Sequence, residues 1–324
     1  MSTPEKSHWI RQNPALYPPF HKAGSMAYDA VHQVSLLFGG GGNNDTWIWN
    51  GKSWRELTPV QSPPARMNAS MVYNTAQKHI VLFGGMNNSG QLLNDTWIWD
   101  GSNWSQVYTA NAPTARSGAS MAYDDIRQQV ILFGGQANDQ RFGALLNDTW
   151  IWDGTMWRST NPSTPPVARQ GASLTNCTAG QHLILFGGSA GHMLLDDTWT
   201  WNGIDWQEHT PTVRPSARAW AAMTYKTHAR QAILIGGGGE GNNTMMPAAL
   251  GDTWAWSGVD WQPLTSSLLP SAGDHCAVYD EARQVITLYA TTGSKTVLDN
   301  TTSTNATSDA SIIASFQSET WLLP

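Results

Sequence analysis

Asp274 and His275 place a carboxylate beside an imidazole in the segment "AGDHCA" (Ala272–Ala277). Corresponding segments elsewhere in the chain, such as "ARSGAS", hold small residues at the same place. Histidine titrates near neutral pH, so an imidazole beside a carboxylate is suited to general acid–base catalysis. His21 and Glu240 break the same pattern in other copies and complete the predicted catalytic group. Drift of the repeat where the chain closes on itself would explain the same departures, and both interpretations stay open.

An arginine recurs at one position of the repeated pattern, each time directly after alanine. The guanidinium groups could brace neighbouring loops through hydrogen bonds, or several could converge on the carboxylate or phosphate of an anionic ligand. Trp220 lies outside the repeated tryptophan positions and would pack against such a ligand. The predicted substrate-binding residues are therefore Arg66, Arg116, Arg169, Arg218 and Trp220.

Two histidines with acids could also hold a metal ion, since imidazole and carboxylate are common ligands. No spacing typical of a metal site occurs in the sequence, however. The sequence therefore predicts neither a metal nor a cofactor.

These residues are positioned by a repeated unit. The phrase "DTW", or a close variant, recurs about every 50 residues, a period typical of solenoids and propellers. After each "DTW" tryptophan the next two tryptophans follow at constant distances, as in Trp47, Trp49 and Trp54. Constant elements joined by loops of variable length indicate one supersecondary unit that is repeated. The copies start at Asp45, Asp95, Asp148, Asp197, Asp252 and Glu319.

Each unit is predicted to form four short strands, which in the second copy are "ASMVY", "HIVLFGG", "DTWIW" and "NWSQVY". Helical periodicity is absent, and glycine and proline separate the apolar runs. Four strands repeated around a ring predict an all-β protein, a six-bladed β-propeller. We expect a single domain over residues 1–324, with blades at about 21–58, 66–108, 116–160, 169–210, 218–265 and 272–324 plus 7–14.

The order of arginine, small inner strand, "LFGG", "NDTW" and a spaced tryptophan resembles the kelch repeat, in particular bacterial kelch propellers and the central domain of galactose-oxidase-like proteins. The resemblance covers the whole chain and implies the propeller fold. It does not imply one activity, because kelch propellers include enzymes, protein adaptors and structural proteins.

The two ends of the chain predict how the ring closes. The sixth copy stops at "ETWLLP", its third strand, whereas "SHWIRQNP" (Ser7–Pro14) matches the fourth-strand segments of the other copies. We therefore expect the N-terminal strand to complete the last blade beside Trp321, which would leave no open sheet edge.

If the first strand of each blade is innermost, the loops that lead into it share a rim with the loops between strands two and three. Loops on a rigid scaffold are the usual place for binding sites. The longest of them is a Ser-, Thr- and Asn-rich segment over residues 292–318, predicted to be either a lid or disordered.

Composition excludes several classes of function. Charged residues make up 13% of the chain and the net charge is −6, so no nucleic-acid partner is expected. No apolar run is long enough to span a membrane, and the first residues do not resemble a secretory signal. Cys177 and Cys276 occupy non-equivalent positions and are expected to be free thiols. We expect a cytoplasmic monomer.

Together these features predict a stand-alone propeller that binds a small molecule in its central funnel, and the ligand would be anionic if the arginines converge on it. A cofactor-independent isomerase, cyclase or lyase would fit such a site, although enzyme activity does not follow from the sequence. The alternative is a protein–protein interaction module that uses the same rim of loops.

Overall fold

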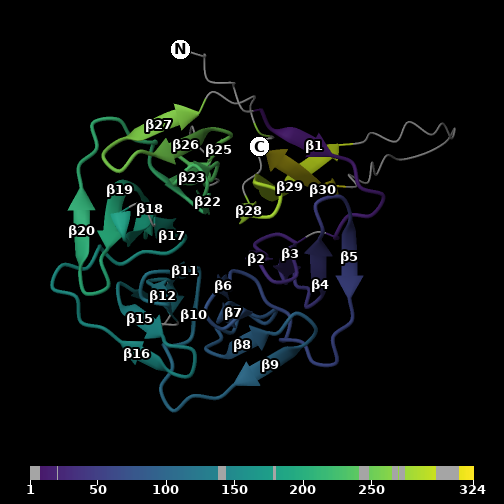
Figure 1. The fold of residues 1–324 in the computed structure, drawn as a ribbon, viewed down its shortest axis with the longest axis horizontal. Coiled ribbons are helices and arrows are strands. Elements are labelled where there is room, and N and C mark those ends of the chain that lie inside the picture. Colours follow the sequence, from purple (N-terminus) through teal and green to yellow (C-terminus); the bar gives the residue numbers. More distant parts are fainter. Residues whose placement is uncertain are drawn as a thin grey trace, which may run out of the picture.

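The four-stranded sheets of the described residues stand around a common axis (Figure 1). The computed structural model describes residues 8–19, 21–137, 144–177, 180–240, 248–264, 269, 274–296 and 314–324. Within them, six four-stranded antiparallel sheets form the blades of a propeller. The predicted six-bladed all-β fold is confirmed.

The blades follow one another along the chain. Blade one consists of β2 (Ser25–Asp29), β3 (Val34–Phe38), β4 (Thr46–Trp49) and β5 (Trp54–Leu57). Blade two consists of β6 (Ser70–Asn74), β7 (His79–Phe83), β8 (Thr96–Trp99) and β9 (Trp104–Val107). Blade three consists of β11 (Ser120–Asp124), β12 (Gln129–Phe133), β15 (Thr149–Trp152) and β16 (Trp157–Ser159).

Blade four consists of β17 (Ser173–Cys177), β18 (His182–Ala190), β19 (Met193–Trp201) and β20 (Trp206–His209). Blade five consists of β22 (Ala222–Lys226), β23 (Gln231–Ile235), β26 (Thr253–Trp256) and β27 (Trp261–Leu264). Blade six consists of β28 (Asp274–Asp280), β29 (Val285–Thr296), β30 (Ala314–Leu323) and β1 (Ile10–Gln12). Two small three-stranded sheets are formed by β10 (Arg116–Ser117), β13 (Gln136–Ala137) and β14 (Ala144–Leu145), and by β21 (Arg218–Ala219), β24 (Gly238–Gly239) and β25 (Ala248–Ala249).

The N-terminal strand closes the ring as the sequence predicts. β1 pairs antiparallel with β30, and Arg11 lies opposite Trp321. Trp9, just before β1, is buried, and its indole N–H donates to the Thr253 hydroxyl of blade five at 3.4 Å. The first and last strands of the chain thus share one sheet.

Apolar side chains fill the junctions between blades. A hydrophobic cluster lies at every junction, including that between blades six and one. At each junction the tryptophan that opens a fourth strand donates its indole N–H to the "DTW" threonine of the preceding blade. The pairs are Trp104–Thr46, Trp157–Thr96, Trp206–Thr149, Trp261–Thr198, Trp9–Thr253 and Trp54–Thr320.

The other two repeated tryptophans stay within their own blade. In blade two, Trp97 donates to the carboxylate of Asp95 at 2.7 Å. Trp99 is buried against Trp104, with ring centroids 5.4 Å apart. The spacing of the tryptophans thus joins the third and fourth strands to each other and to the preceding blade.

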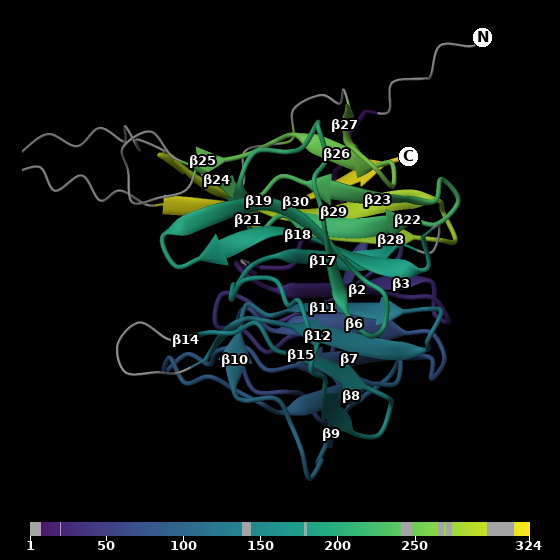
Figure 2. The ribbon, with the colours of Figure 1, turned by 90° about the vertical axis from the view of Figure 1, so that its left-hand side faces the viewer.

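The first strand of each blade is innermost, and neighbouring inner strands (β2, β6, β11, β17, β22 and β28) are in contact around the axis. Figure 2 shows that β14, β24 and β25 and the extended ends of β18, β19 and β30 project from one side of the molecule. Parts of the predicted 292–318 loop are strands, because β29 continues to Thr296 and β30 begins at Ala314. Residues 297–313 lie outside the described part of the chain, so the choice between lid and disorder stays a prediction.

Candidate functional site

The four repeated arginines are buried ion-pair partners of the "DTW" acids. Arg116 is only 1% exposed, and its two terminal nitrogens donate to the Asp148 carboxylate at 2.6 and 2.8 Å. It also donates to the carbonyl oxygens of Thr114 and Gly134, both at 2.9 Å. The same set of bonds is made by Arg66 with Asp95, Arg169 with Asp197 and Arg218 with Asp252.

The ion pairs perturb the carboxylates. For Asp95, Asp148 and Asp252, burial on its own would raise the pKa, but the arginine hydrogen bonds and charge outweigh it, and the pKa is lowered. The arginines therefore already satisfy a carboxylate of their own blade. Of the two interpretations that the sequence left open, the geometry supports bracing. None of the four lines either cavity on the axis.

His21 occupies the arginine position of blade one and takes over the arginine's role. It is 2% exposed, its Nε2 lies 3.4 Å from the Asp45 carboxylate, and its Nδ1 contacts the carbonyl of Gly39. Burial alone would raise the pKa of Asp45, but hydrogen bonds from His21 and Trp47 outweigh it and lower the pKa. The structure places this predicted catalytic residue inside blade one, away from the axis. In blade six the repeated acid is Glu319, which pairs with Arg11 of the N-terminal strand at 2.9 Å.

His275 is the predicted catalytic residue that does reach the axis. It is half-buried at the junction of blades five and six, and a Cβ atom on Gly236 would lie 2.9 Å from its Cε1. It lines a cavity of about 200 Å³ together with the serines and alanines at the starts of the inner strands. Glu240 is exposed directly after β24. Asp274 is the first residue of β28, and its side chain lies outside the described part of the structure.

The rim of this cavity carries backbone in the left-handed region. Equivalent residues of blades one to five have positive φ: Ala23 (57°), Asn68 (53°), Gly118 (63°), Gly171 (62°) and Trp220 (61°). In blades two to five the N–H of this residue donates to the carbonyl of its counterpart in the preceding blade, from Asn68 to Ala23 through to Trp220 to Gly171. We call this end of the axis, with its cavity and rim, the Trp220 mouth.

Trp220 extends from blade five across blades four and three. A Cβ atom added to Gly171 or to Gly118 would lie 2.7 Å from the indole. These two glycines therefore leave the room that the ring occupies. Trp220 itself is half-buried.

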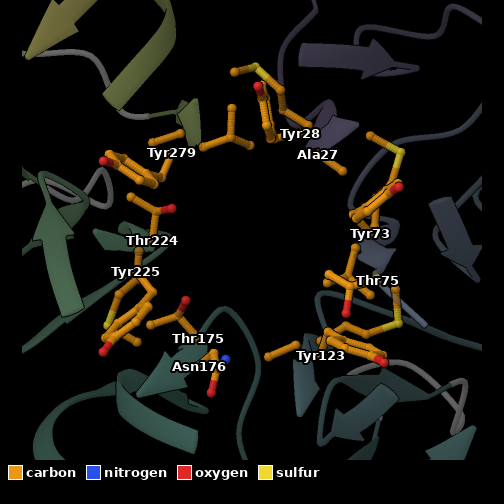
Figure 3. Close-up of a pocket in the computed structure, with 18 of the residues that line it drawn as sticks. Ala27, Tyr28, Tyr73, Thr75, Tyr123, Thr175, Asn176, Thr224, Tyr225 and Tyr279 are labelled. Atoms are coloured by element: carbon orange, nitrogen blue, oxygen red, sulfur yellow. The ribbon is translucent and has the colours of Figure 1, made fainter. Parts of the chain in front are cut away.

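A second cavity lies at the opposite ends of the inner strands, and the sequence analysis did not predict it. It encloses about 210 Å³ and is surrounded by Tyr28, Tyr73, Tyr123, Tyr225 and Tyr279 together with threonines and Asn176 (Figure 3). We call it the tyrosine mouth. The methionines of the inner strands line both cavities, so both cavities open onto one axis.

The charged side chains among those that line the tyrosine mouth are Asp125 and Glu281. Both follow the repeated tyrosine by two residues, where the other described blades have Ala30, Thr75 and Thr227. The comparison of repeats that singled out Asp274 and His275 would have found them as well.

No group of three metal-ligating side chains occurs among the described residues. The same part of the chain holds no helix long and apolar enough to cross a bilayer. Neither Cys177 nor Cys276 forms a disulfide, as predicted.

The blade order, the "DTW" bracing and the closure through β1 define a six-bladed propeller of the kelch class. A family model described as the KLHDC2/KLHL20/DRC7 Kelch-repeats domain matches residues 25–237 and 100–289, and the chain belongs to this kelch-repeat family. The two matches overlap, as near-equivalent repeats allow.

Among solved structures, that of YjhT is similar, with a TM-score of 0.68 and 15% sequence identity over 85% of this chain and 91% of that chain. At this identity the likeness concerns the fold alone. No curated protein matches the chain.

Proposed function

We propose that the chain binds a small molecule at the Trp220 mouth, with the indole of Trp220 as a packing surface and His275 as a polar group of the cavity wall. The observation that carries the proposal is the backbone of Trp220. A φ of 61° is uncommon for any residue other than glycine and is costly for a bulky one. Such strain tends to cluster at ligand sites, where it is part of the mechanism.

The other positions of this ring show what the fold itself requires. Equivalent residues in blades one to four are alanine, asparagine and two glycines. The architecture is therefore made without a large side chain there, and a glycine would fit position 220 without strain. A half-exposed indole beside a cavity offers a flat apolar surface, which suits an aromatic ring or the apolar face of a sugar ring.

The ion pairs of the four repeated arginines bear on the charge of the ligand that the Trp220 mouth would bind. The four arginines predicted to hold an anion are already paired, so they supply no reason to prefer a carboxylate or a phosphate. We infer a neutral or weakly charged ring-shaped ligand. His275 would serve as its hydrogen-bonding partner and, if the ligand is turned over, as the group that moves a proton.

The experiment is Trp220→Gly, with methyl pyranosides and phenol as neutral probes in saturation-transfer NMR. We expect the variant to lose the saturation transfer that the parent shows, while its melting temperature is unchanged or higher because the strain is relieved. The matched control is Tyr108→Ala, which removes an aromatic side chain 84% exposed in blade two. This variant should change neither the saturation transfer nor the melting temperature.

A lower melting temperature with undiminished ligand signals would make Trp220 a structural residue and overturn the proposal. His275→Ala tests the role of the imidazole. This variant should weaken the probe signals only if the imidazole contacts the ligand. The alternative, a protein-binding module on the same rim, predicts no response to any of these small probes.

A further inference from the structure

The tyrosine mouth has the shape and lining of a second ligand site, at the opposite end of the axis from Trp220. Its wall combines methionine, valine and alanine side chains with tyrosine rings and threonines. A concave, partly apolar surface with a few polar groups is the usual character of a small-molecule site. Figure 3 shows the labelled tyrosines and threonines arranged around an open centre.

The two carboxylates of this mouth lie on opposite sides of the ring. Asp125 belongs to blade three and Glu281 to blade six, and in a six-membered ring these blades face each other across the axis. The Asp125 carboxylate is held by two blades, since it accepts from Thr75 of blade two at 3.4 Å and from Asn176 of blade four. Its direction is therefore fixed by the walls of the mouth.

Several basic side chains near the mouth have partners of their own. Arg127 binds Asp124 at 2.9 Å, Arg283 binds Asp280 at 2.7 Å and His32 binds Asp29 at 2.8 Å. In blade five, Lys226 donates to the carbonyl of Pro324, and His228 contacts the hydroxyl of Tyr279. Among the described residues that line the cavity, the charge is thus negative only.

The mouth disfavours the ionised form of the two carboxylates, and a nearby positive charge would stabilise that form. Both acids are exposed to solvent, yet the walls of the concave mouth desolvate the Asp125 carboxylate and raise its pKa, and the charge of Asp124 adds to this. Desolvation by the walls also raises the pKa of Glu281, and the charge of Asp125 adds to this. Burial raises the pKa of Tyr28 to about 12, so this tyrosine stays neutral.

We propose that the tyrosine mouth binds a linear alkyl diamine or polyamine, with one ammonium group at Asp125 and another at Glu281. The methylene chain between two ammonium groups matches the apolar wall that separates the two acids. Threonine hydroxyls of the wall can accept the remaining ammonium hydrogens, whereas the tyrosine hydroxyls point away from the open centre (Figure 3). A calcium ion would need six or more oxygen ligands within about 2.6 Å, which two opposed carboxylates do not supply.

The test is a calorimetric titration of the full chain with 1,5-diaminopentane at low salt, where exposed charges are least screened. We expect measurable binding, at least tenfold weaker in Asp125→Asn and in Glu281→Gln, and absent in the double variant. Glu208→Gln, which neutralises an exposed acid on β20, is the matched control and should bind as the parent does. 1-Aminopentane should bind more weakly than the diamine, and 1,5-pentanediol should not bind.

Several results would overturn the proposal. They are absence of diamine binding at millimolar concentration, equal binding of the diol, or unchanged affinity in the double variant. Calcium binding that depends on both acids, without diamine binding, would make the mouth a metal site instead. Trp220→Gly should leave diamine binding unchanged, so the two mouths are tested separately.

Discussion

At the scale of single residues, the arginine position of the repeat holds a side chain that braces the "DTW" acid in most blades and a different residue in one or two. Arg66, Arg116, Arg169 and Arg218 are braces, and His21 is a weaker one. Sequence comparison could mark these positions but could not tell bracing from ligand binding. Arginine and its acid are about 30 residues apart by way of a loop of variable length, and no local pattern joins them.

Loss of one brace should be costly. Arg116→Ala removes the arginine donor from the Gly134 carbonyl and from the Asp148 carboxylate, which keeps its bond from Trp150, and we expect the free energy of unfolding to fall by roughly 3 kcal/mol. Urea denaturation measures the change. Arg158→Ala removes an exposed arginine 3.6 Å from Asp153 and should cost less than about 1 kcal/mol. Equal losses in the two variants would show that the buried pair braces nothing.

The acids of the tyrosine mouth should have the opposite effect on stability. The pKa values of Asp125 and Glu281 are raised in the folded state. Above the pKa of the unfolded chain, ionisation of the two groups therefore lowers the free energy of unfolding. This loss vanishes at a pH where both groups are protonated. The double variant Asp125→Asn, Glu281→Gln should therefore melt higher than the parent at pH 7 and at the same temperature near pH 3. Thermal melts at the two pH values measure this, and a lower melting temperature of the variant at pH 7 would contradict it.

At the scale of strands and blades, the sequence was sufficient for the fold. Regular placement of "GG", "DTW" and the spaced tryptophans fixed four strands per blade, and the incomplete sixth copy pointed to β1. The tyrosine mouth was missed for a physical reason. Its tyrosines served as markers of the repeat, and their common arrangement around an axis becomes visible only when six blades are assembled.

Deletion of residues 1–12 tests the closure. It removes β1 and Trp9, leaves the backbone of β30 unpaired and exposes the apolar cluster between blades five and six. We expect a lower melting temperature and self-association through the open edge, measured by calorimetry and sedimentation. Deletion of residues 1–7 is the control and should leave both unchanged. A monomeric 1–12 deletion with the parent melting temperature would contradict the pairing.

At the scale of the whole molecule, the inner strands form a second ring of bonds with one gap. Serine hydroxyls at the start of β2, β6, β11 and β17 donate to the backbone of the next blade at 2.7 or 2.8 Å. Cys276 makes the equivalent contact from blade six to Gly24 at 2.9 Å. Blade five has Ala222 at this position and lacks the hydroxyl.

Filling this gap should stabilise the ring. In Ala222→Ser a hydroxyl would face the carbonyl of His275, and a hydrogen bond of this kind contributes about 1 kcal/mol. We expect a higher melting temperature, measured by calorimetry, whereas Ser70→Ala should lower it by removing the bond to Ala119. A destabilised Ala222→Ser would indicate that the junction of blades five and six is packed differently from the others.

The pairing of β1 with β30 also has a consequence for biosynthesis. The ribosome makes residues 10–12 early, yet their partners at residues 320–322 are made only after five complete blades have emerged. Until then Trp9 has no blade six against which to pack. The segment of residues 10–12 must therefore stay without its partner strand while blades one to five are synthesised, and the ring can close only after β30 has been made.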